Sequence, residues 1–243
     1  MLSGSPASCR PVGSRRCRSR ISTATRSERY WPLVKIKRDL ENHVRGLLKN
    51  LGLVIGRAKF NVFAVRAEEL IEGRPELIAA IRPLLEARNA VEQQVSELDR
   101  RVMKLARHDA QVRRFMTVPG VGPITALAFK ATIDDPARFA RSRSVGAYVG
   151  LTSRRHASGE VDWTGRISKC GDAMLRSYLF EAAGVLLTRV PKWSAVKAWG
   201  VKLAKRNGLR KAKVAVARKL AVILHRMWID GTEFNWSKKE IAA

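Results

Sequence analysis

The stretch Phe115-Met-Thr-Val-Pro-Gly-Val-Gly-Pro-Ile-Thr-Ala-Leu127 decides how the second half of the chain folds. It joins the end of an apolar helix to a Pro-Gly-Val-Gly turn, and a second helix then restarts with the small residues Thr125 and Ala126. This order is typical of a helix–hairpin–helix, because Gly120 and Gly122 can adopt backbone angles that other residues avoid. Such a hairpin presents its amides, and the N-terminus of the next helix, to a phosphate.

An ordinary tight turn between two helices is the alternative. We favour phosphate contact because the chain is strongly basic: 47 Lys and Arg residues stand against 21 Asp and Glu residues among 243, a net charge of +26. A compact body with this excess repels itself unless a polyanion neutralises it. Nucleic acid is therefore the favoured partner, ahead of an anionic membrane surface. The expected contacts in the hairpin, which would not depend on base sequence, are Pro119, Gly120, Gly122 and Thr125.

Before this hairpin, apolar residues recur at helical spacing over 33–53, 60–72 and 75–108. The seam of the last segment is close to heptad spacing, which predicts a helical hairpin or coiled-coil arm. A packed helical bundle is an equal alternative.

After the hairpin, helices are expected over 172–189, 193–206 and 210–229, and the last two are strongly basic. Trp193, Trp199 and Trp228 lie in this region; their rings could stack on bases, but indoles at helical spacing are more often core residues, which we favour. The predicted fold class is therefore mainly α: a helical arm followed by a helical domain that contains the helix–hairpin–helix and a short irregular or β-like insert.

The insert begins in Gly146-Ala-Tyr-Val-Gly-Leu-Thr-Ser-Arg-Arg-His-Ala-Ser-Gly-Glu160. A serine beside glycine in a basic loop is usually a turn residue. Ser158 becomes a candidate nucleophile if Arg154 and Arg155 hold a phosphodiester next to it. The residues themselves supply no evident base for Ser158, although His156 is near in sequence.

The next stretch is Gly165-Arg-Ile-Ser-Lys-Cys-Gly-Asp-Ala-Met-Leu-Arg176, in which Asp172 is a good helix N-cap. A capped helix with surface charges is the better interpretation from the residues alone. Ser168 is a second and weaker candidate hydroxyl. Three cations would cluster at this helix start, where a phosphate is favoured: Arg166, Lys169 and Arg176.

The three cysteines and four histidines show no metal-ligand spacing, so no metal site is expected in this chain. The cysteines also fit a reducing cytoplasm. No apolar run of about 18 residues exists, and the first thirty residues lack the apolar stretch of a secretory signal. We therefore expect a cytoplasmic protein that does not span a membrane.

Four quoted segments, in order and spacing, resemble one known family: Val118–Ala126, Tyr148–Thr152, Ser158–Glu160 and Gly165–Asp172. The family is that of the serine-dependent bacterial insertion-sequence transposases. The likeness is specific over about 112–189 and looser over 33–111.

In that family a resolvase-like amino-terminal half carries a DEDD carboxylate set, and a serine of the carboxy-terminal domain becomes joined to DNA. The resemblance implies that Ser158 is this nucleophile, with Ser168 as the alternative. It also implies a guide RNA and a homo-oligomer, for which the 75–108 helix is the expected interface.

The resemblance divides the chain into four parts: 1–32, a helical linker over 33–111, the transposase carboxy-terminal domain over 112–230, and a tail over 231–243. The first part is rich in Arg and Ser and is expected to be disordered. It holds a single acid, Glu28, so it cannot be the metal-binding half, and we interpret it as an out-of-frame or truncated remnant.

The expected cofactor, Mg²⁺, would therefore belong to that half, and we expect this chain alone not to cut DNA. Two alternatives stay open. An intact copy could complement the chain in trans, or the chain could be a helix–hairpin–helix DNA-binding protein without catalysis.

Overall fold

The computed structural model describes residues 18–56 and 62–236, and these are mainly helical, as the sequence predicts. Two compact units divide between Val102 and Met103, whereas the sequence placed a boundary at 111. The smaller unit, Arg26–Val102, holds α2 (Phe63–Ile71) and most of α1 (Arg18–Asn50) and α3 (Pro75–His108); the start of α1 and the end of α3 belong to the larger unit. The larger unit continues with α4 (Ala110–Met116), α5 (Pro123–Ile133), η1 (Pro136–Arg138), α6 (Arg143–Tyr148), β1 (Ser153–Ser158), β2 (Val161–Ile167), α7 (Ala173–Thr188), α8 (Ala195–Asn207) and α9 (Leu209–Asp230).

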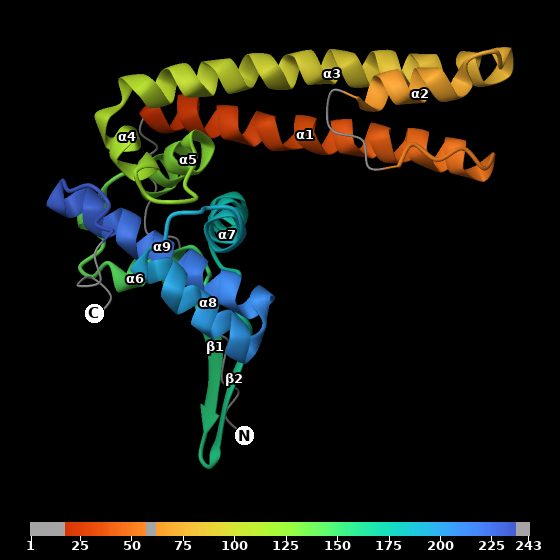
Figure 1. Cartoon of the computed structure of the whole chain (residues 1–243). Coiled ribbons are helices and arrows are strands. Elements are labelled where there is room, and N and C mark those ends of the chain that lie inside the picture. The colour runs from red at the N-terminus through yellow and green to blue at the C-terminus, as the bar shows by residue number, and fades with distance from the viewer. Residues whose placement is uncertain (1–17, 57–61, 237–243) are drawn as a thin grey trace, which may run out of the picture. The chain divides into compact units, whose positions relative to one another are not determined.

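The smaller unit is a helical hairpin in which α1 and α3 run antiparallel and α2 packs beside them (Figure 1). Its apolar core takes residues from all three helices and from the connection after α1: Val44, Leu48, Ile55, Phe63, Ala67, Ile71, Ile81 and Leu85. The predicted seam of α3 therefore faces its own hairpin over much of its length.

Buried ion pairs fix the register of this hairpin. Lys37 of α1 lies 2.9 Å from Glu92 of α3, and Arg88 lies 3.1 Å from Glu41. Lys37 and Arg88 are almost fully buried. Since a lone charge in such a place is costly, a slip of one helix past the other would separate each cation from its carboxylate at a large cost in free energy.

The helix α1 begins at Arg18, inside the segment 1–32 that the sequence predicted to be disordered. The weak apolar periodicity of that segment suggested no helix. Extending an existing helix costs far less than nucleating one, so the amphipathic part after Leu33 can propagate toward the N-terminus. Residues 1–17 lie outside the described part of the chain.

The larger unit is organised around α9, which packs against α4, α6, α7 and α8. Its core includes a cluster of aromatic rings, in which the centroid of the Phe115 ring lies 5.4 Å from the ring centroids of both Phe129 and Trp228. Trp228 is therefore a core residue, as expected. Trp193 and Trp199 are exposed over 61% and 37% of their surface, so the sequence prediction that they are core residues is wrong.

The predicted β-like insert is an antiparallel pair of strands, β1 and β2, which projects from the helices as a hairpin (Figure 1). Ser158 pairs with Val161 at its tip, and Gly159 and Glu160 form the two-residue turn. Gly159 has φ +56°, as the first central position of a type II′ turn requires. A bulge near Ser153 and Arg155 interrupts the pairing at its base.

Candidate nucleic-acid interface

The predicted phosphate-binding turn joins α4 to α5. Gly120 has φ +88°, and a Cβ placed there would lie 2.5 Å from the carbonyl oxygen of Ala182 in α7. The glycine therefore allows the turn to pack directly on a helix backbone. This close approach gives Gly120 a structural role, whereas the sequence interpretation assigned it to ligand contact.

The other three residues predicted in this turn fall into two groups. Pro119 and Thr125 are buried, and their predicted contact with DNA stays a prediction. Gly122 is extended at φ −91° and has open space around its Cβ position, so it does not need the backbone freedom of glycine. No side chain caps the N-terminus of α5 at Gly122, and phosphate contact there stays a prediction.

Arg176 stabilises the base of the β-hairpin. Its Nη1 lies 3.1 Å from the carbonyl oxygens of Val149 and Lys169 and 3.2 Å from that of Cys170. These contacts join the turn before β1 to the turn after β2. Gly150 permits this approach, because a Cβ there would lie 2.1 Å from the Cys170 oxygen. The guanidinium that was predicted to contact DNA is thus engaged with backbone.

Arg154 and Ser168 meet at this same base. Arg154 donates from Nη2 to the carbonyl oxygen of Ser168 at 3.1 Å, and the Ser168 amide donates to the Thr152 oxygen at 2.8 Å. Ser168 is half-buried there, whereas the neighbouring Lys169 is exposed. The Arg154 guanidinium thus contacts the backbone of the other candidate serine, and its predicted role beside Ser158 stays a prediction.

Ser158 lies at the opposite end of the hairpin and is exposed. Arg155 forms a two-pronged pair with Asp162, with distances of 2.8 Å and 2.5 Å between nitrogen and oxygen. That pairing holds the pKa of the Asp162 carboxyl below its usual value. Arg155 is therefore already paired within the hairpin. Strands rise about 3.3 Å per residue, so Ser158 and Ser168 are separated by the length of β1, roughly 17 Å.

A large groove lies between the base of the hairpin and the helices α8 and α9, with a cavity volume of about 1190 Å³. It is lined by seven cations and by no acid: Arg143, Arg166, Lys169, Arg210, Lys211, Arg218 and Lys219. Arg166 and Lys169 were predicted as phosphate contacts, and the groove brings them together with cations from α6 and α9.

Most of this groove was not predicted from the sequence. The last helices are recognisably basic, but a charge run does not reveal which side of a helix faces which partner. Trp163 was not singled out at all, and it lines the groove together with Trp199. An isolated tryptophan in a polar strand with Thr164 and Arg166 was the one available signal.

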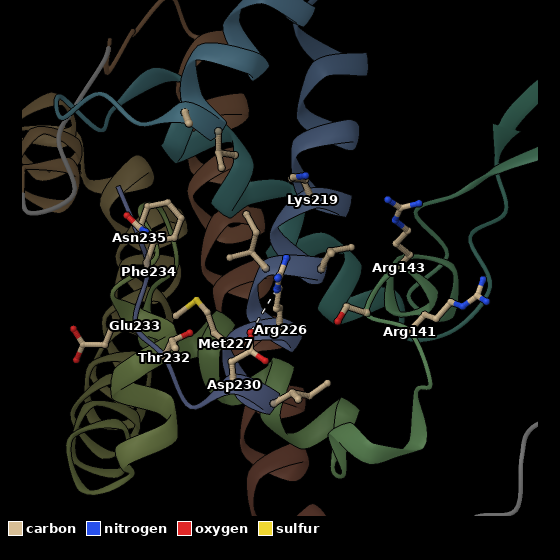
Figure 2. A pocket seen from close by; sticks show the side chains of 16 residues that line it. Arg141, Arg143, Lys219, Arg226, Met227, Asp230, Thr232, Glu233, Phe234 and Asn235 are labelled. Atoms are coloured by element: carbon tan, nitrogen blue, oxygen red, sulfur yellow. Dashed lines mark ion pairs between the residues drawn. The ribbon is translucent and has the colours of Figure 1, made fainter. Parts of the chain in front are cut away.

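A second hollow, of about 550 Å³, adjoins the groove and shares Arg143, Lys219 and Val222 with it. Figure 2 shows Arg141 and Arg143 across this hollow from Glu233, with Arg226 and Asp230 paired at 3.4 Å. Because acids and cations both line this hollow, it suits a polyanion less well than the groove does. The charged residues that line the groove are all cations.

Within residues 18–56 and 62–236, no group of three His, Cys, Asp or Glu side chains comes together in a way that could hold a metal ion. The residues present therefore do not fit the two-metal carboxylate set that the resemblance places in an amino-terminal half. No helix in the same ranges is both long enough and apolar enough to cross a membrane.

Comparison with known protein families gives a match in the middle of the chain. Residues 112–198 match the model of the family described as Transposase IS116/IS110/IS902. The matched region holds the turn at Gly120, the β-hairpin and α7, and thus both candidate serines.

Longer alignments connect the chain to whole transposases. It is 32% identical over 197 residues to the "Transposase for insertion sequence element IS1111A" of Coxiella burnetii, which covers 79% of this chain and 54% of that protein. It is 32% identical over 198 residues to the "Probable family 20 transposase" of Pseudomonas aeruginosa, covering 79% and 59%. A third relative, the "Transposase for insertion sequence element IS1328" of Yersinia enterocolitica, is 29% identical over 206 residues, covering 84% and 61%. The chain thus spans little more than half the length of the relatives it matches.

Proposed function

We propose that this chain is the DNA-binding carboxy-terminal part of an insertion-sequence transposase and acts in DNA transposition and recombination. The observation that carries the proposal is the groove of seven cations, which lies beside the hairpin of the family-matched region. Phosphates neutralise such a surface and release counterions, which gives affinity without reading sequence.

The proposed nucleophile is Ser158. Its exposed position on a projecting tip lets the hydroxyl reach a phosphodiester that is bound elsewhere in an assembly. In the proposed step the Ser158 Oγ forms a bond to phosphorus while a bond from phosphorus to a deoxyribose oxygen breaks. The serine proton passes to a base or to water, and the departing oxygen takes up a proton.

No step is assigned to a metal ion, because the described carboxylates do not form a site for one. Neither Arg154 nor Arg155 is directed at Ser158, since the first binds the Ser168 carbonyl and the second binds Asp162. We therefore propose that the chain alone does not cut DNA. The catalytic site would be completed by carboxylates of another domain or of an intact second copy.

The test is a transposition assay with the amino-terminal half of a full-length relative supplied together with this chain, scored for covalent protein–DNA product. Ser158→Ala should abolish the product, and Ser168→Ala should leave it. Ser177→Ala is the matched control, because Ser177 is an exposed serine of α7 whose hydroxyl donates to the Ala173 carbonyl of its own helix.

Loss of product with Ser168→Ala alone would mean that Ser168 is the nucleophile, at the base of the hairpin where Arg154 also lies. If neither Ser158→Ala nor Ser168→Ala changes the amount of covalent product while the chain still binds DNA, the chain is a DNA-binding protein without catalysis. That second function is favoured by the engagement of Arg154 and Arg155 within the protein. Nicking by the isolated chain with Mg²⁺ would contradict the proposal that it needs a partner.

A further inference from the structure

Two indole rings lie in the basic groove. Trp163 of β2 is exposed over 54% of its surface and Trp199 of α8 over 37%, and both line the cavity. Large apolar rings left open to water among charges lose the burial that usually stabilises them. Their position therefore indicates that a ligand with its own apolar faces covers them.

The Trp163 ring lies against the backbone of β2 at Gly165. The ring carbon Cζ3 lies 3.0 Å from the position that a Cβ on Gly165 would take. These residues stand two apart on the strand, so they share one face, and the missing side chain at 165 leaves room for the indole. The ring therefore lies close to the strand at Gly165, where no side chain displaces it.

The cations around the rings are available to a ligand. Among the described residues, the seven lining cations form no ion pair with any carboxylate, in contrast to Arg155, Arg88 and Lys130. They come from α6, β2, the turn after β2 and α9, and they line the same cavity as the rings. A ligand with regularly spaced negative charges and flat apolar faces matches this lining.

We infer that the groove binds an unpaired strand of nucleic acid, whose bases stack on Trp163 and Trp199 while its phosphates contact the surrounding cations. The inference rests on the proposed function and narrows its substrate. In a duplex the base faces are already stacked on each other, so the cations would find partners but the indoles would not. Basic grooves with exposed aromatic rings are the arrangement that binds single strands with little sequence preference.

The experiment measures binding of the full chain to a labelled single-stranded DNA oligonucleotide, the RNA of the same sequence, and the matching DNA duplex, by fluorescence anisotropy. Each ring should contribute at least about five-fold to single-strand affinity. We therefore expect Trp163→Ala and Trp199→Ala each to weaken single-strand binding by this factor and to leave duplex binding within about two-fold. The DNA and RNA arms identify which kind of strand fits better.

Three controls keep the result interpretable. Trp193→Ala removes an exposed indole that lies outside the groove and carries Lys197 over its ring at 5.0 Å, so it should change nothing. Trp163→Phe keeps an aromatic face and should restore much of the binding. A thermal melt of each variant separates a loss of stacking from a loss of folding.

The possible failures are distinguishable. If the duplex binds as tightly as the single strands and neither indole matters, the inference is overturned while the proposed DNA-binding function stands. Equal weakening on single strands and duplex, with intact melts, would also overturn it, because the rings would then serve a general contact. If none of the three nucleic acids binds, both the inference and the proposed function fail.

Discussion

At the scale of single residues, Gly120 and Gly122 make a matched pair with opposite expectations. Alanine at Gly120 must adopt φ +88° and must displace the backbone of α7 from contact. We expect Gly120→Ala to lower the free energy of unfolding by about 3 kcal/mol. Gly122→Ala should stay within about 0.5 kcal/mol, since its backbone is extended and its surroundings are open. Urea denaturation measures both, and equal costs would refute the packing role of Gly120.

Asp109 gives the fold a dependence on pH. Burial alone would raise the pKa of its carboxyl, but the hydrogen bonds from Lys130 and from the amides of Val112 and Gln111 outweigh burial and leave the pKa below its usual value. A group with a lowered folded pKa stabilises the fold fully above its unfolded value, and that contribution is lost as the pH falls through the folded value.

We therefore expect the difference in unfolding free energy between the native chain and Asp109→Asn to be constant above about pH 5 and to shrink below about pH 4. Denaturant titrations at a series of pH values would measure it. A difference that does not change with pH would show that the carboxylate acts only as an N-cap, a role worth about 1 kcal/mol that asparagine also fills.

Some roles of single residues could be predicted from the sequence and others could not. The sequence indicated a particular role for Gly120, Asp172 and the basic residues near the hairpin, and Asp172 does cap α7 by accepting from the amides of Met174 and Leu175. The sequence did not distinguish Arg176, which binds three carbonyl oxygens, from Arg166, which lines the groove. The two side chains have the same chemistry, and only the backbone brought near each of them by distant contacts separates their roles.

At the scale of elements, the base of the β-hairpin depends on Arg176. Replacing it with glutamine leaves the carbonyls of Val149, Lys169 and Cys170 without their charged donor. We expect Arg176→Gln to lower the free energy of unfolding by about 2 kcal/mol. Arg166→Gln, which removes the same charge from the groove lining, should leave stability nearly unchanged and weaken nucleic-acid binding. Chemical denaturation and anisotropy on both variants compare the roles, and an exchange of the two phenotypes would contradict the structure.

Helices were far easier to predict than the hairpin. The expected segments 75–108, 172–189 and 210–229 correspond to α3, α7 and α9 within a residue or so at each end, because apolar residues at helical spacing repeat over many turns. The strands carry charged and polar residues on both faces and bury little, so no alternating pattern marks them. Their pairing is set by the Gly159 turn and by the contacts at the base.

At the scale of the whole molecule, the groove belongs to no single element. The hairpin and α6 contribute one part of its lining and α8 and α9 the other, so the groove joins two regions, 143–169 and 195–230, that are separated in sequence. The net charge of +26 predicts a polyanion, but it spreads over the chain and names no site. What the fold adds is the convergence of seven cations and two indoles on one cavity, which no local pattern encodes.

Salt dependence measures how many of those cations bind phosphate. Removing α8 and α9 would be a poor test, because α9 packs against α7, α8 and α6 and holds the larger unit together. Substitution is cleaner: Arg210→Gln with Lys211→Gln should reduce the slope of log affinity against log salt by about 0.7 for each phosphate left without its cation on a single strand, or about 0.9 on a duplex. Lys205→Gln with Arg206→Gln removes two exposed cations of α8 outside the lining; this variant is the control and should leave the slope unchanged. Equal changes in the two variants would mean that phosphates are attracted by the total charge of the protein, and an unchanged slope in both would remove the groove from the binding surface.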